Sequence, residues 1–80
     1  PLLRKQAIDV LELLRGSLLQ LLENGIRHGQ LRPEVDKKAF ASVSIALLEG
    51  AIMMSKLHGD NKDIRMALKH LEKMIDDITL

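Results

Sequence analysis

The 80-residue sequence contains no cysteine, tryptophan or tyrosine, and Phe40 is its one aromatic residue. Without cysteine, neither disulfides nor thiolate metal sites can stabilise a domain of this small size, so its stability must come from packing. With a single aromatic ring, the chain also lacks the stacking platforms on which proteins bind unpaired bases. A reducing, cytoplasmic location fits the absence of cysteine and is the location that we expect.

An excess of charge of either sign is also missing. Twelve lysines and arginines stand among eleven acidic residues, which leaves a net charge of +1 and no basic patch that could grip phosphate. We therefore expect this chain not to bind DNA directly. Its longest uncharged run, residues 39–48, is much shorter than the roughly 20 residues of a membrane span, so we expect no membrane contact. The opening PLLRKQ lacks a signal-peptide pattern and a Met, which suggests an excised fragment.

Motifs that carry catalysis or hold a cofactor are absent as well. The sequence has no Gly-x-Ser-x-Gly elbow, no glycine-rich phosphate loop and no His-Glu-x-x-His helix. A catalytic site needs a nucleophile or an acid with a positioned partner, and the sequence shows no motif that supplies one, so we expect no catalytic residues and no enzyme activity. His28 and His58 each precede a glycine that would end a helix, where a cation is favoured, so we interpret them as helix-end residues. We expect neither a metal ion nor a cofactor.

What the sequence does contain is helical periodicity. Apolar residues make up 46% of the chain, and no period-two alternation persists, which argues against a sheet. Glycine and proline divide the chain into helices predicted at residues 3–28, 37–58 and 61–78. The sequence thus predicts an all-α fold, in which residues 1–80 form a single helical domain of three antiparallel helices.

Turn and capping residues mark the ends of these helices. Gly29 and Gly59 stand where left-handed C-terminal caps belong. Asp36 is predicted to cap the second helix through its carboxylate. Asp60 is predicted to cap the third helix, with Asp63 three residues later completing an acidic variant of the capping box.

The third predicted helix is amphipathic in the ordinary way. Its apolar residues repeat at alternating spacings of four and three and draw one stripe of about 120° on a helical wheel. They are Ile64, Leu68, Leu71, Ile75 and Ile78. Charged residues fill the remaining surface, so one face is predicted to be covered and the other solvated.

The middle helix has two apolar sides. Its polar strip, made by Ser42, Glu49 and Lys56, is only about 60° wide. The first side carries Ala39, Val43, Ala46, Gly50, Met54 and Leu57, and the second carries Phe40, Leu47, Leu48, Ala51 and Ile52 with Ser44 and Ser55. Two helices cannot readily cover both sides, so the first side is predicted to pack within the domain and the second against another copy of the chain.

The predicted dimer interface combines the second side of the middle helix with the stripe of the third helix. Its residues are Phe40, Leu47, Leu48, Ala51, Ile52, Ser55, Ile64, Leu68, Leu71 and Ile75. Ala46 and Gly50 are expected to allow close helix packing, because a glycine inside a helix costs about 1 kcal/mol that tight packing can offset.

The order of these motifs resembles the C-terminal half of the regulatory domain in TetR-family transcriptional regulators. Residues 29–32 match a Gly-x-Leu-Arg turn after a long helix, and Asp36 opens the next helix. Residues 48–50 match a Leu-Glu-Gly segment, and residues 59–60 match a Gly-Asp turn before the last helix. The resemblance covers most of the chain.

The resemblance implies a place in a larger regulator. In such proteins an N-terminal helix-turn-helix domain, absent from this chain, binds DNA, and the last two helices form a four-helix bundle with a symmetry mate. The long helix before them forms one wall of an effector pocket. We therefore expect a homodimer that binds a small-molecule effector, and that contacts DNA only through the missing domain.

Candidates for the effector pocket are Leu11, Leu14, Leu18 and Ser44. The leucines could equally fill a core, and the hydroxyl of Ser44 could bond back to its own helix. An alternative function is a free-standing helical adaptor whose groove receives an amphipathic helix from another protein.

Overall fold

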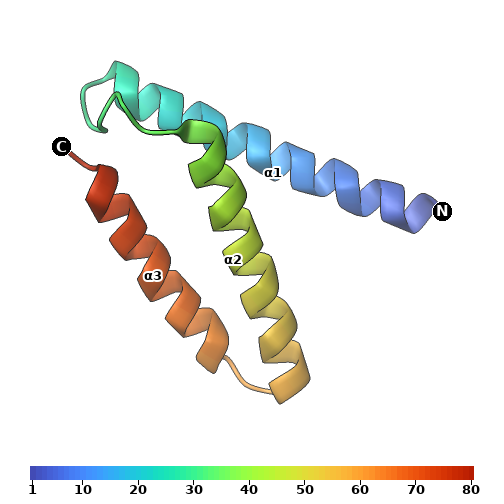
Figure 1. The fold of residues 1–80 in the computed structure, drawn as a ribbon. Coiled ribbons are helices and arrows are strands. Elements are labelled where there is room, and N and C mark those ends of the chain that lie inside the picture. Colours follow the sequence, from blue (N-terminus) through green and yellow to red (C-terminus); the bar gives the residue numbers. More distant parts are fainter.

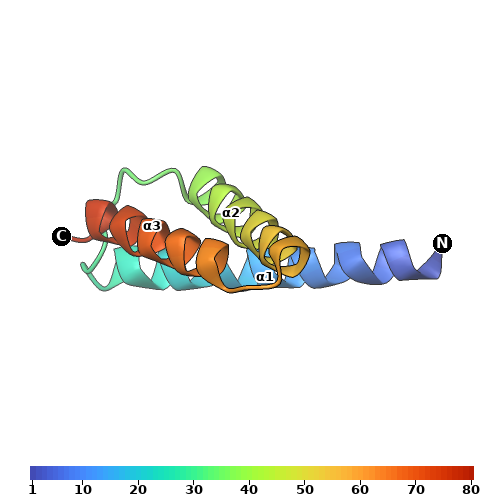
Figure 2. The same ribbon diagram turned by 90° about the horizontal axis from the view of Figure 1, so that it is seen from below.

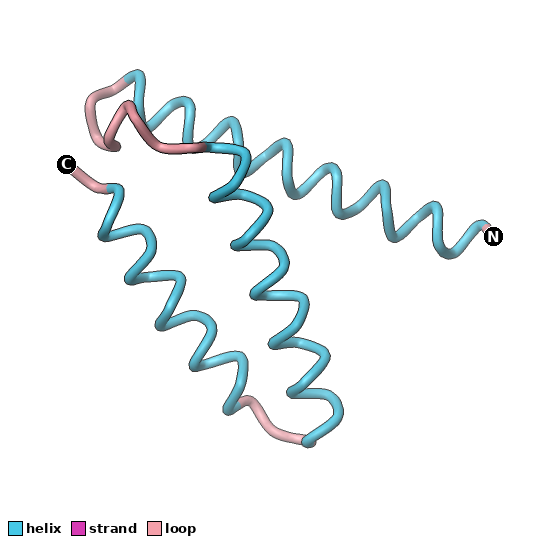
Figure 3. The backbone as a smooth tube through the Cα atoms, viewed as in Figure 1, coloured by secondary structure: helices cyan, strands magenta, loops and turns pink.

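The computed structural model describes residues 1–80 as three α-helices without β-strands (Figures 1 and 3). They are α1 (Leu2–Arg27), α2 (Lys37–His58) and α3 (Lys62–Ile78). The predicted all-α class is confirmed, and every predicted helix end lies within one residue of the observed one.

The helices form two layers. α2 and α3 run antiparallel, side by side, and α1 crosses beneath them in a separate layer (Figure 2). α2 packs against both other helices, whereas no Cα atom of α1 lies within 8 Å of a Cα atom of α3. The N-terminal half of α1 extends beyond α2, and all of residues 1–14 except Leu11 are exposed.

Local capping explains where the helices end. Gly29 and Gly59 have positive φ angles of 72° and 73°, as predicted for left-handed caps. The carboxylate of Asp36 accepts a hydrogen bond of 3.1 Å from the amide of Ala39, which confirms the cap of α2.

The predicted capping box of α3 is wrong. α3 begins at Lys62, one residue later than predicted, so Asp63 is too early in the helix to reach back to the cap. Asp60 does cap the start of α3 as predicted, because its carboxylate accepts a hydrogen bond of 3.0 Å from the amide of Lys62, although the residue directly before the helix is Asn61. Asp63 pairs with His58, whose Nδ1 lies 3.0 Å from Oδ2, and this contact joins the end of α2 to the start of α3.

The core lies where α2 meets its two neighbours and is built from small residues. The buried residues are Leu22 and Gly25 of α1, Ala41, Ser44, Ala51 and Ser55 of α2, and Ala67 of α3. Small side chains let helix backbones approach closely, but they bury little apolar area. No large side chain is fully buried, so this core is thin.

The predicted roles of the two sides of α2 were reversed. Ala51 and Ser55, assigned to the partner-facing side, are buried against the chain's own helices. Val43 and Leu57, assigned to the domain interior, are exposed. Both sides are apolar, so hydrophobicity could not distinguish them. The small residues at the inward positions allow the helices of the same chain to approach that side.

Candidate functional site

An exposed apolar surface runs along α2 on the side opposite its buried residues. We call it the outer face, and its members are Ala39, Val43, Ala46, Gly50, Met53, Met54 and Leu57. Its four large side chains, Val43, Met53, Met54 and Leu57, are between 46% and 78% exposed. A monomeric soluble protein rarely leaves so continuous an apolar stripe in water, so this face is a candidate interface.

A groove between α2 and α3 continues the outer face. It encloses about 350 Å³ and is lined by Ala46, Leu47, Gly50, Ala51 and Met54 from α2 and by Asp63, Met66, Ala67 and His70 from α3. A Cβ atom built on Gly50 would contact nothing within 4 Å. No part of this chain therefore uses the close approach that Gly50 permits, and the predicted close packing there stays a prediction about a partner.

The structure separates the residues predicted for the dimer interface into three groups. Ala51 and Ser55 are buried within the chain and have little surface left to offer a partner. Phe40, Leu47, Leu48, Ile64 and Leu71 are half-buried. Ile52, Leu68 and Ile75 remain exposed. The sequence placed Ala46 and Gly50 correctly on one continuous side of α2, but missed that this side is the open one.

A second candidate site lies between α1 and α2. Leu14 and Leu18, two of the predicted pocket residues, line a cavity of about 250 Å³ together with Ser17, Leu21, Ile45, Leu48 and Glu49. Leu11 lines a separate cavity of about 370 Å³ nearer the N-terminus, and Glu49 lies at its edge as well. The wall contributed by α1 is therefore mostly apolar, with Gln6 and Ser17 as its polar members, and Glu49 of α2 is the one charged side chain that lines both cavities.

Two polar residues of α2 differ in their relation to these cavities. Ser44 lines neither cavity. It is buried on the inward side of α2, and its hydroxyl has no hydrogen-bond partner there. Glu49, on the predicted polar strip, is exposed, and it also borders both cavities beside α1, a place that the sequence prediction did not give it. A signal was present, because Glu49 is the one acidic residue of α2.

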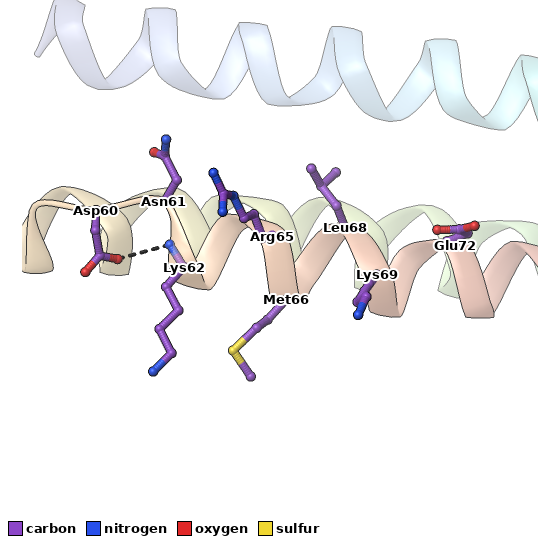
Figure 4. A pocket seen from close by; sticks show the side chains of 8 residues that line it. All are labelled: Asp60, Asn61, Lys62, Arg65, Met66, Leu68, Lys69 and Glu72. Atoms are coloured by element: carbon purple, nitrogen blue, oxygen red, sulfur yellow. Dashed lines mark hydrogen bonds between the residues drawn. The ribbon is translucent and has the colours of Figure 1, made fainter.

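A broad depression of about 830 Å³ lies along the first half of α3, but its side chains do not converge. Its lining is mostly charged or polar, with Met66 and Leu68 as the apolar members. Figure 4 shows Asn61, Arg65 and Leu68 projecting from one side of the helix, while Lys62 and Met66 project from the other. This surface offers no set of groups that could hold one ligand.

The length and apolar composition of α2 are sufficient for a membrane span. An apolar helix that packs inside a protein passes the same criterion, so this property alone is weak evidence for a membrane. The polar strip of Ser42, Glu49 and Lys56 runs along the helix, which is unfavourable in lipid. Packing against other protein explains the apolar surface better.

Comparison with known proteins agrees with this architecture. A model of the family described as tetracyclin repressor-like, C-terminal domain matches residues 1–71. The crystal structure of a TetR transcriptional regulator from Chloroflexus aurantiacus J-10-FL superimposes with a TM-score of 0.90 at 32% sequence identity. The match covers 99% of this chain and 40% of that regulator's chain. A search of curated proteins gave no match. The three-helix chain described above belongs to the family of TetR-type C-terminal domains.

Proposed function

We propose that this chain is the dimerisation and effector-binding portion of a TetR-type transcriptional regulator. The observation that carries the proposal is the outer face of α2, an apolar surface that no helix of the chain covers. A second copy of the chain, related by a two-fold axis, would bury both outer faces at once, because the same patch serves both subunits. α2 and α3 of the two copies would then form a four-helix bundle.

The chain exposes more surface than an ordinary folded monomer of its mass, and the excess is large enough for such an interface. A folded monomer of this mass is expected to expose about 4,850 Å² by the scaling of surface with size, whereas this chain exposes 6280 Å². The excess of roughly 1,400 Å² is more than the about 800 Å² that one partner contributes to a standard protein interface. It is sufficient for a dimer interface and for a further covered surface along α1.

The effector would bind beside α1. The cavity lined by Leu14 and Leu18 is apolar, which suits a ligand with a hydrophobic body, and Ser17 and Glu49 could orient its polar groups. We keep Leu11 as a candidate, because its cavity adjoins Glu49 as well. Ser44 is the weakest of the predicted effector residues, since it is buried and lines neither cavity beside α1.

Regulation would follow from a difference in ligand affinity. An effector can shift the dimer between two arrangements only if it binds one of them more tightly than the other. Such a shift would change the separation of two helix-turn-helix domains on the complete regulator and so release the operator. DNA contact would belong to those domains, and the protein would act as a non-enzymatic regulator in the cytoplasm.

The test of dimerisation places one negative charge on the outer face. Val43→Glu adds a carboxylate at an exposed position, where it should not disturb the isolated subunit, but in the proposed dimer that charge would be buried. We expect sedimentation equilibrium at micromolar concentration to show a dimer for the parent protein and at least about tenfold weaker association for the variant.

Ser42→Glu is the matched control. It adds the same charge to the preceding residue, which lies on the polar strip of the same helix. Its association should equal that of the parent protein. A parent protein that sediments as a folded monomer, or equal weakening in both variants, would contradict the proposal.

A further inference from the structure

The turn between α1 and α2 contacts the C-terminal ends of both α1 and α3. The amides of Gln30 and Leu31 donate hydrogen bonds of 2.8 and 3.1 Å to the carbonyl of Gly25, near the end of α1. Leu31 then forms an isolated antiparallel bridge with Thr79, just after α3. One short segment is therefore bonded to the C-terminal ends of two helices.

The contact with α1 depends on a glycine. A Cβ atom built on Gly25 would lie 2.6 Å from Cδ1 and 2.7 Å from Cγ of Leu31. Gly25 is buried, and the side chain of Leu31 occupies the space that any other residue at this position would fill. Leu31 is thus seated directly on the backbone of α1.

The contact with α3 is made by backbone and side chain together. The amide of Arg32 donates to the carbonyl of Ile78 at 2.8 Å, and the amide of Leu80 donates to the carbonyl of Gln30 at 3.0 Å. The Nε atom of Arg32 donates to the carbonyl of Asp77 at 3.2 Å. A cationic side chain is favoured there, because the last carbonyls of a helix carry partial negative charge.

We propose that residues 29–32 form a coupling joint that transmits motion between α1 and α3. The backbones of the two helices do not approach within 8 Å of each other between Cα atoms, so the backbone connections between α1 and α3 run through α2 along their lengths and through this joint at one end. A change in the tilt of α1 must therefore move the end of α3 or break the joint. The regulatory meaning rests on the proposed function: the joint would link the wall of the effector cavity to the helix pair that dimerises.

The test breaks a bond between the joint and α3 and measures the response of the bonds between the joint and α1, which the amides of Gln30 and Leu31 donate to Gly25. Leu80→Pro removes the amide that bonds Gln30, and the extended conformation of Thr79 accepts a following proline. We expect hydrogen exchange at the amides of Gln30 and Leu31 to become about fivefold faster, the factor that corresponds to the loss of one hydrogen bond. Arg32→Ala removes the Nε bond to Asp77 and leaves the backbone bond to Ile78, and it should accelerate the same amides.

Leu80→Ala is the matched control, because it keeps the amide and shortens a side chain that is already exposed. Its exchange rates should equal those of the parent protein. Unchanged rates at Gln30 and Leu31 in Leu80→Pro would overturn the proposal, as would equal acceleration at Ala51 in the middle of α2. Exchange is measured without an effector, and sedimentation of each variant reports dimerisation separately, so failure of the joint is distinguishable from failure of the proposed function.

Discussion

At the scale of single residues, small side chains decide which helices of this chain can meet. Gly25, Ala51 and Ala67 are buried, one on each helix, whereas half of the leucines and three of the four methionines are exposed. Of the five glycines, only Gly25 has another side chain where its own Cβ would be. Substitution of Gly25 should therefore change the free energy of unfolding in the opposite direction to substitution of Gly16, the glycine in the middle of α1.

Gly25→Ala should destabilise the protein. The new methyl group would displace Leu31, and overpacking of this kind costs about 1–3 kcal/mol, of which helix propensity returns about 1 kcal/mol. Gly16→Ala meets nothing within 4 Å and should stabilise the protein by up to about 1 kcal/mol. Urea unfolding of both variants measures the difference. If both variants were stabilised, Leu31 would not be seated as described.

The cap of α2 provides a second prediction for a single residue. Asp36→Ala removes the acceptor for the amide of Ala39 and should lower the free energy of unfolding by about 1 kcal/mol. Asp36→Asn keeps an acceptor at the same position and should cost only a few tenths of that. The same urea titration compares them, and equal losses in the two variants would rule out the cap as the cause.

At the scale of elements, the order and ends of the helices were predictable because they depend on local patterns. Glycines at positive φ and the carboxylate of Asp36 act within a few residues of themselves, so the sequence alone indicates them. The inward side of α2 was not predictable from hydrophobicity. A usable signal existed in the recurrence of Ala41, Ser44, Ala51 and Ser55 along one line of the helix, since small residues permit close approach.

α2 also carries the prediction that concerns helix packing between subunits. Gly50→Leu fills open space on the isolated chain, so the subunit should still fold. In the proposed dimer the same side chain would overpack a close helix crossing, and self-association should weaken by more than about 1 kcal/mol. Sedimentation equilibrium measures this, with Gly50→Ala as the smaller substitution. An unchanged dimer affinity in Gly50→Leu would remove Gly50 from the contact.

At the scale of the whole molecule, the chain is flat and leaves most of its residues exposed to solvent. Its extents are 39 × 31 × 15 Å, and only 7 of its 80 residues are buried. So few buried side chains cannot offset the conformational entropy of ordering three helices, which amounts to about 1–2 kcal/mol per residue for the backbone alone. Covering the outer face would supply part of the missing stabilisation.

The stability of the protein should therefore depend on its concentration. If folding and dimerisation are linked, the Tm should rise by several degrees when the concentration increases from about 1 to 100 μM, because mass action stabilises the associated state. Val43→Glu should have a lower Tm that varies less over the same range. Calorimetry at several concentrations measures this. A Tm that is independent of concentration in the parent protein would indicate a subunit that is stable without a partner.

The sequence by itself determined three helices, their ends, the presence of two apolar sides on α2 and the TetR-type character of the chain. These features follow from periodicity and from short-range capping, which act within one or two helical turns. Only the tertiary structure decided which side of α2 is buried and that the turn at Leu31 reaches the end of α3. Those outcomes depend on how closely helices can approach one another, and that distance is set by small residues that are far apart in the chain.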